Sequence, residues 1–292
     1  MSTAAISLKQ KKIKIVFIKP SKYDDEGFVI RHFRGVLPSN TLACLSSLTQ
    51  DVAKRGLLGT ETELTVELID DTVQKIPVKR IIRSNRLPYR RTVVALAGVQ
   101  SNQFPRAADL ARKFRAGGLQ VLIGGFHVSG MLALSEGISP EIQELLDIGV
   151  TVVKGEVEET WGEILRDAAE DKLKALYDFL DCKPDIYAQP LPKVERKYLK
   201  RFIVSKFGTI DCSRGCPFNC SFCSIINVQG KEMRVRSPER LAESIRENYH
   251  RHRLRFYFFT DDNFARNCCW KEVFAMLIRL REEEHIPLQF MI

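Results

Sequence analysis

Apolar and polar positions divide the first 170 residues into two kinds of segment. Short runs that are continuously apolar or alternating predict β-strands, and longer segments with apolar residues at helical spacing predict helices. Strands are expected at 14–18, 64–70, 92–98, 119–123 and 150–153. Helices are expected at 38–48, 104–114 and 156–169. Because the strands alternate with helices, the pattern predicts a doubly wound parallel sheet of the α/β class.

The loops that directly follow these strands are the candidate binding positions, because ligands of such sheets bind at the carboxyl ends of the strands. Seven residues stand out in the loops after the third, fourth and fifth strands: Ser101, Gln103, Gly124, Gly125, His127, Gly155 and Glu156. The glycines would let backbone approach a large flat ligand or its tail. No G-x-G-x-x-G follows the first strand, which argues against a nicotinamide cofactor. Two roles remain for His127: a loop residue that hydrogen-bonds backbone, or a direct contact to the cofactor.

A change in composition separates this part from the rest of the chain. The segment 171–206 is rich in proline and charge and is interpreted as a linker. Beyond it, strands are expected at 207–211, 254–259 and 286–292. Ser237 and Pro238 predict the start of a helix, with Ser237 as its cap, and another helix is expected at 270–284. The predicted units are therefore 1–170 and 207–292.

The candidate chemistry lies in the loop after the strand at 207–211. Cys216, Cys220 and Cys223 stand at C-x3-C-x2-C spacing, in a loop that Gly215 and Pro217 keep irregular. Structural zinc sites use four ligands, usually as two separated pairs. An iron–sulfur cube also uses four ligands. Three thiolates on one loop would leave one iron open to a small molecule.

This loop, with Phe222 before the last cysteine, resembles the cluster loop of the radical S-adenosylmethionine (SAM) enzymes. The stretches 214–220 and 259–264 resemble the branch that carries a cobalamin-binding domain in front. The resemblance implies a Rossmann-like cobalamin-binding domain followed by the first part of a (β/α)6 partial TIM barrel. That barrel normally has six strand–helix units, so the chain is expected to be an amino-terminal fragment of a longer enzyme.

The same resemblance implies a set of cofactors and their positions. Cys216, Cys220 and Cys223 would hold a [4Fe-4S] cluster whose open iron binds SAM. Phe222, expected to be buried in either role, would lie near the adenine. Asp261, Asp262 and Asn263 would lie near SAM, although the aspartates also suit a metal site, a general base or a helix cap.

Cobalamin is expected in the loops of the first unit. The resemblance implies reductive cleavage of SAM to a 5′-deoxyadenosyl radical and methyl transfer from methylcobalamin to an unactivated carbon. No side-chain acid or base is expected to act, because the cofactors carry the chemistry. The motif Asp-x-His-x-x-Gly, whose histidine ligates cobalt, is absent, so His127 is not assigned as the cobalt ligand.

Composition indicates the cellular compartment and the role of the cysteines. With 292 residues, eight cysteines and no export signal at the start, the chain is expected to be cytoplasmic and to use cysteine for metal rather than disulfides. Cys212 has two candidate roles, a structural residue at the end of a strand, which we favour, and an alternative metal ligand. The remaining cysteines lack ligand spacing and are expected to be small apolar fillers: Cys44, Cys182, Cys268 and Cys269.

The net charge of +9 comes from scattered basic residues, so nucleic acid is an unexpected partner. Arg234 and Arg236 are candidate charge partners. The expected partners are a small-molecule or lipid substrate and an electron donor such as flavodoxin or ferredoxin, and no segment is apolar enough to span a membrane. One alternative is a methylthiotransferase, although its front domain would bring three cysteines and residues 1–170 contain only Cys44. Another is a non-catalytic iron–sulfur or zinc module with Cys212 as fourth ligand.

Overall fold

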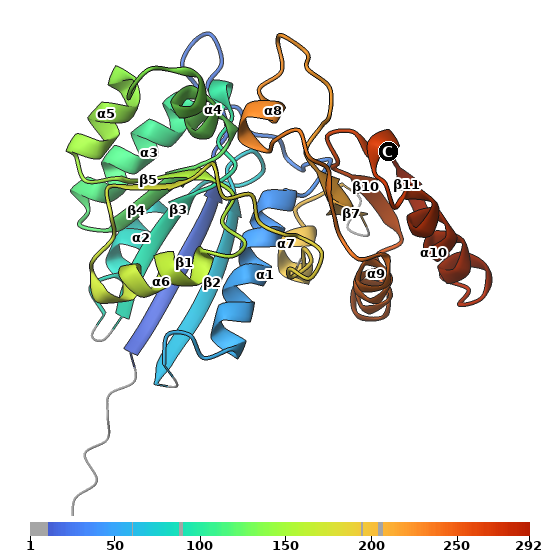
Figure 1. Cartoon of the computed structure of the whole chain (residues 1–292). Coiled ribbons are helices and arrows are strands. Elements are labelled where there is room, and N and C mark those ends of the chain that lie inside the picture. Colours follow the sequence, from blue (N-terminus) through green and yellow to red (C-terminus); the bar gives the residue numbers. More distant parts are fainter. Residues whose placement is uncertain (1–10, 60, 88–89, 194, 204–206) are drawn as a thin grey trace, which may run out of the picture.

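The computed structural model describes residues 11–59, 61–87, 90–193, 195–203 and 207–292. Two parallel sheets lie side by side, each with helices packed on it (Figure 1). The expectation that the first residues are no export signal falls mostly on 1–10, which lie outside the described residues. Four positions of the predicted linker, 194 and 204–206, lie outside them as well.

The first sheet contains six parallel strands in the order β2-β1-β3-β4-β5-β6. Their bounds are β1 (Lys11–Lys19), β2 (Thr62–Asp70), β3 (Arg90–Leu96), β4 (Gln120–Gly124), β5 (Thr151–Gly155) and β6 (Leu176–Phe179). The five strands predicted in this region are confirmed. β6 was not predicted, and it lies in the segment interpreted as a linker. The strand order reverses between β1 and β3, which is where sheets of this kind bind ligands.

Helices cover both faces of this sheet, because neighbouring residues of β1 are buried on opposite sides. Ile15 and Phe17 pack in one core with α1 (Asn40–Lys54) and α6 (Trp161–Glu170). Val16 and Ile18 pack in the other core. The helices that cover this second face are α2 (Val78–Ser84), α3 (Phe104–Ala116) and α5 (Pro140–Asp147). Ser39 caps the start of α1, because its Oγ accepts a hydrogen bond from Leu42 N at 3.3 Å.

Two local predictions in this unit were wrong. The helix expected at 156–169 begins only at Trp161, so Glu156 and Glu158 belong to a loop. His127, expected in a loop, lies in the first turn of α4 (Phe126–Leu134). Because Glu156 and Glu158 lie outside α6, their carboxylates can face the second unit.

The second sheet contains three parallel strands in the order β11-β10-β7. They are β7 (Phe207–Ile210), β10 (Phe256–Phe259) and β11 (Gln289–Met291), and the helices α9 (Pro238–His252) and α10 (Trp270–Glu282) pack beside each other on this sheet. The predicted cap Ser237 accepts a hydrogen bond from Arg240 N at 3.3 Å. This arrangement agrees with the expected first part of a β/α barrel. Shorter elements complete it: the antiparallel pair β8 (Ser213–Arg214) and β9 (Arg234–Val235), and the helices α7 (Arg196–Leu199) and α8 (Ile225–Val228).

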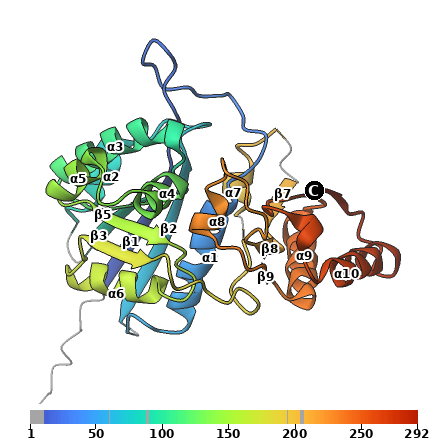
Figure 2. The same ribbon diagram turned by 45° about the horizontal axis from the view of Figure 1, so that its top comes forward.

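A shared apolar core joins the two units. Ile210 and Cys212, at the end of β7, belong to the same buried cluster as Leu42 of α1 and Phe202. The Tyr198 hydroxyl accepts a hydrogen bond from Ser39 N at 3.1 Å. Figure 2 shows α7 and α8 between the two sheets. Within the described ranges, no helix is both long and apolar enough to cross a bilayer.

Candidate active site

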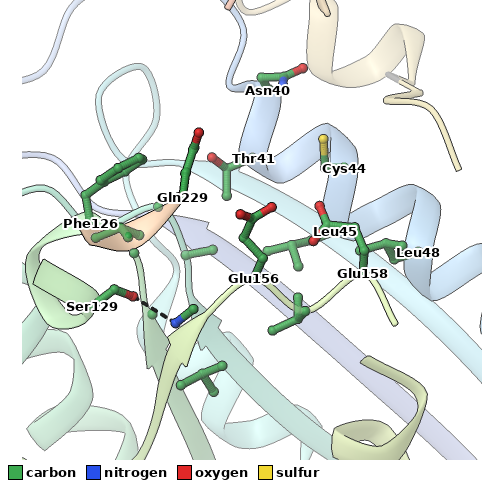
Figure 3. Close-up of a pocket in the computed structure, with 18 of the residues that line it drawn as sticks. Asn40, Thr41, Cys44, Leu45, Leu48, Phe126, Ser129, Glu156, Glu158 and Gln229 are labelled. Atoms are coloured by element: carbon green, nitrogen blue, oxygen red, sulfur yellow. Dashed lines mark hydrogen bonds between the residues drawn. The ribbon is translucent and has the colours of Figure 1, made fainter. Parts of the chain in front are cut away.

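A cavity of about 400 Å³ lies where the two units meet. Its floor comes from the carboxyl ends of β3, β4 and β5, and one wall comes from the start of α1 (Figure 3). The second unit supplies lining residues from the cysteine-loop region and the end of β10: Asp211, Arg214, Val228, Gln229, Thr260 and Asp262. The two regions that the sequence assigned to different cofactors therefore border one space.

The glycines of this cavity are required by the fold itself. Gly125 has φ +140°, and a Cβ there would lie 2.2 Å from Val99 N. Gly155 has φ +91°, and its Cβ would lie 2.7 Å from the carbonyl carbon of Phe179. Neighbouring backbone thus already occupies the space beside both glycines. Ser129 Oγ accepts a hydrogen bond from Gly155 N at 3.1 Å, which fixes the end of β5 (Figure 3).

Four of the seven residues predicted for cobalamin line the cavity: Gly124, Gly125, Gly155 and Glu156. The other three, Ser101, Gln103 and His127, are not part of its lining. His127 lies with Nδ1 3.2 Å from Ser101 Oγ and Nε2 3.1 Å from Glu141 Oε1, and its ring packs on Phe104. Gln103 Oε1 accepts a hydrogen bond from Gln100 N at 3.1 Å. These three side chains hold the loop after β3 and the start of α4.

Two buried polar atoms of the lining have no hydrogen-bond partner among the described residues. They are Asn40 Oδ1 and Thr260 Oγ1, one from each unit. A buried polar group without a partner is costly, so such atoms point to a ligand or ordered water. The lining therefore suits a ligand with polar groups that reach both units.

The cysteine loop is open to solvent. Cys220 is exposed, Cys216 and Cys223 are half-buried, and all three thiols are free. In the part of the chain that the structure describes, no three His, Cys, Asp or Glu side chains are close enough together to hold a metal ion. The prediction that Phe222 is buried was wrong, since it is 91% exposed. The donor set nevertheless suits an iron–sulfur cluster, because three thiols lie on one irregular loop.

The other cysteines differ among themselves. Cys212 is 1% exposed and packs in the core, where burial raises the pKa of its thiol well above its usual value. Cys44 is also buried and lines the cavity. The interpretation as small apolar fillers was wrong for Cys182 and Cys268, which are exposed. Cys182 follows β6, and Cys268 precedes α10.

The carboxylates after β10 contact the start of the cysteine loop. Asp261 accepts hydrogen bonds from Cys212 N at 2.9 Å and Ser213 Oγ at 2.5 Å. Asp262 accepts a long hydrogen bond from Gly215 N at 3.4 Å. Asn263 Nδ2 lies 3.8 Å from Cys216 Sγ. Burial raises the pKa of both aspartates to about 6. The residues predicted near SAM thus lie against the loop predicted to hold the cluster.

An ion cluster connects this loop with the first unit. Arg214 bonds Glu156 at 2.7 Å and Asp211 at 3.0 Å, and it also bonds Glu158. Arg234 lies 2.5 Å from Glu156, and Arg236 lies 2.9 Å from Asp211. The expectation that Arg234 and Arg236 are charge partners is confirmed. Three cations thus face three carboxylates, most of them buried.

The pKa values follow from this pairing. Burial opposes ionisation of Asp211, but Arg236, Arg214 and Asn40 outweigh it and hold the pKa of this carboxyl well below its usual range. Burial acts likewise on Glu156, and Arg234 and Arg214 lower its pKa. Both carboxylates therefore stay ionised beside the cavity. The roles of Glu158, Arg214 and Asp211 were not predicted from the sequence. The only signal was position, since Asp211 follows a strand and Arg214 precedes a cysteine.

The same fold occurs in known proteins. The chain has the fold of cobalamin-dependent radical SAM methyltransferases. It superimposes on TsrM from Kitasatospora setae, solved with cobalamin and a [4Fe-4S] cluster, with a TM-score of 0.62 and 15% identity over 95% of this chain and 55% of that chain. OxsB, solved with aqua-cobalamin, gives a TM-score of 0.54 and 17% identity over 97% of this chain and 38% of that chain.

Sequence relatives are methyltransferases. The bacteriochlorophyllide d C-8(2)-methyltransferase of Chlorobaculum tepidum is 37% identical over 145 residues, 49% of this chain and 30% of that protein. The hopanoid C-2 methylase of Rhodopseudomonas palustris is 24% identical over 54% of this chain and 28% of that protein. No protein-family model matches the chain. The matched part is less than a third of either relative. The resemblance to the cobalamin-binding branch of the radical SAM enzymes is confirmed.

Proposed function

We propose that this protein is a radical SAM enzyme that uses cobalamin to methylate an unactivated carbon of its substrate. In this proposal, unit 207–292 holds a [4Fe-4S] cluster and SAM, and unit 1–170 holds cobalamin. The observation that carries the proposal is the shared cavity. The carboxyl ends of β3, β4 and β5 form one side of it, and Asp211 and Arg214 from the cysteine-loop region form the other.

The residues of this chain bind and position in such a reaction. Cys216, Cys220 and Cys223 are the candidate cluster ligands, because they are three free thiols on one loop. When bound, the cluster and SAM supply a radical that removes a hydrogen atom, and cobalamin supplies the methyl group. Asp261 and Asp262 hold the backbone of the loop through Cys212 N and Gly215 N. Gly125 and Gly155 shape the floor of the cavity.

The rival functions have less support. A methylthiotransferase would bring three cysteines in its front domain, and residues 1–170 contain only Cys44. A four-cysteine zinc module would need Cys212, whose thiol lies in the core shared with Ile210. Cytoplasmic location and an electron donor such as flavodoxin or ferredoxin remain parts of the proposal.

The substrate is proposed to be a small molecule or a lipid. The names of the two sequence relatives refer to a bacteriochlorophyllide and a hopanoid. The neighbour TsrM has also been solved with its tryptophan substrate. These three substrates share no single scaffold.

The test is cluster reconstitution under anaerobic conditions with added hydroxocobalamin. We expect a reducible four-iron signal in electron paramagnetic resonance that changes on addition of SAM, together with retained cobalamin absorbance. The triple variant Cys216→Ala, Cys220→Ala, Cys223→Ala is expected to lose the cluster signal. Cobalamin absorbance should persist in this variant, because its proposed site lies in the other unit.

Other outcomes contradict separate parts of the proposal. Zinc in place of iron, or a cluster that survives the triple variant, would contradict the radical SAM assignment. A cluster without retained cobalamin would leave radical SAM chemistry and remove the methyl-transfer assignment.

A further inference from the structure

Arg214 stands between the cavity and the cysteine loop. Its side chain is 14% exposed, and its guanidinium bonds Glu156 and Glu158 of the first unit and Asp211 of the second. The same residue lies two positions before Cys216, and both glutamates line the cavity. One guanidinium therefore contacts the cavity lining and also belongs to the chain that enters the loop.

The neighbours of Arg214 leave it little freedom to move alone. Asp211 is held from the other side by Arg236, at 2.9 Å, and Glu156 is held by Arg234, at 2.5 Å. Arg214 itself pairs with Arg234 across the short β8–β9 ladder. A buried ion that loses one partner becomes costly, so the members of such a cluster keep their partners when one of them shifts. A movement of Glu156 or Glu158 is thus expected to carry Arg214 and the following loop with it.

The cysteine loop is the part of the second unit that this ion cluster can affect. Its three thiols are free, and Cys220 is exposed to solvent. A ligand that fills the cavity removes water from Glu156 and Glu158, and exclusion of water strengthens their contacts with Arg214. Such a ligand is therefore expected to hold the start of the cysteine loop more firmly and to lower the accessibility of its thiols.

We propose that Arg214, Glu156 and Glu158 act as positioning residues that couple occupancy of the cavity to the arrangement of the cysteine loop. This proposal rests on the proposed function, in which a corrinoid occupies the cavity.

The test measures thiol protection in the reduced, cluster-free protein. The protein is treated with iodoacetamide, with and without saturating hydroxocobalamin, and alkylation of Cys216, Cys220 and Cys223 is followed by peptide mass spectrometry. We expect hydroxocobalamin to slow alkylation of the three loop cysteines about fivefold or more. Alkylation of the exposed Cys268 is expected to stay unchanged.

Two variants separate coupling from simple shielding. Glu158→Gln keeps the side-chain shape and removes the charge that Arg214 contacts, and Arg214→Gln removes the guanidinium. In both, the protection of the loop at saturating hydroxocobalamin is expected to disappear, with occupancy of the cavity measured in each variant from the retained corrinoid absorbance. The matched control is Arg246→Gln, which breaks the exposed ion pair with Glu284 and should keep the protection.

The outcomes distinguish this proposal from the proposed function. Failure of the wild-type protein to retain hydroxocobalamin would overturn both. Retention of hydroxocobalamin without protection of the loop would overturn only the coupling. Equal protection in wild type, Glu158→Gln and Arg214→Gln would show direct shielding by the corrinoid and would also overturn the coupling.

Discussion

The guanidinium of Arg214 lies 2.7 Å from the carboxylate of Glu156, and this contact joins the entry of the cysteine loop to the end of β5 in the other sheet. Both side chains are mostly buried, with 14% and 9% exposed. The two units are therefore connected by ionised groups as well as by the apolar core beneath them. Four consequences of this junction and its surroundings can be measured.

The first prediction concerns the buried pair Asp211 and Arg236. The Arg236 side chain is 1% exposed, and its replacement in Arg236→Gln leaves Arg214 as the charged partner of Asp211 among the described residues, with Asn40 and Cys44 as uncharged ones. We expect the free energy of unfolding to fall by about 3 kcal/mol, because a buried carboxylate loses a charged partner. Urea denaturation checks this. Arg246→Gln, at an exposed pair, should cost about 1 kcal/mol or less, and equal costs for the two variants would contradict the prediction.

The second prediction concerns pH and Asp261. Burial raises the pKa of Asp261 from an ordinary 3.8 to about 6, although hydrogen bonds from Cys212 and Ser213 oppose the rise. Below both values the carboxyl is protonated in the folded and the unfolded protein. As the pH rises from 4 to 6 the unfolded chain loses this proton first, so the contribution of Asp261 to stability falls and stays low above pH 6.

The variant Asp261→Asn removes this titration and keeps one acceptor oxygen for Cys212 N. Between pH 4.5 and 7, the free energy of unfolding of the variant should fall by about 2 kcal/mol less than that of wild type. Denaturant titrations at the two pH values measure this difference. Asp25→Asn, at an exposed position, should follow wild type. Parallel pH profiles for wild type and Asp261→Asn would refute the assignment.

The third prediction compares two glycines in the same backbone conformation. Gly215 has φ +92° and Gly27 has φ +85°. A Cβ at position 215 would lie 2.3 Å from Glu232 O, whereas nothing lies within 4 Å of a Cβ at position 27. We expect Gly27→Ala to cost about 1 kcal/mol, for its left-handed backbone alone. Gly215→Ala should cost more and lower the iron content after reconstitution, because the clash displaces the chain beside Cys216. Equal unfolding midpoints for both variants would contradict this.

The fourth prediction concerns thiol reactivity. Burial raises the pKa of Cys44 to about 12, and the charge of Asp211 adds to the effect. At pH 8 about one Cys44 thiol in ten thousand is then ionised, and the thiolate is the nucleophile. Cys182 and Cys268 are exposed. Brief treatment of the folded protein with iodoacetamide, followed by mass spectrometry, should modify these two and leave Cys44 intact. Rapid modification of Cys44 would show that the junction opens.

Local sequence pattern predicted most of the architecture. Strand positions from β1 to β5 followed from runs such as 92–98, because a strand buried on both faces must be apolar throughout. The cap Ser237 was also predicted, since capping depends on a side chain and the amide three residues later. Pattern failed at the start of α6. Thr160 stands at the N-cap of α6 but makes no capping hydrogen bond with its side chain, and Arg214 holds Glu156 and Glu158 outside the helix.

The sequence by itself determined the parallel α/β fold, the family resemblance and the three thiols on one loop, because each depends on residues close together in the chain. Only the tertiary structure decided which charges meet. Arg214 and Glu156 are 58 positions apart, and Arg236 and Asp211 are 25 apart. The chain contains 45 basic and 36 acidic residues, so its composition allows very many pairs. The packing of the two units selects a few of them, because a buried charge is stable only beside an opposite charge that the fold brings to it.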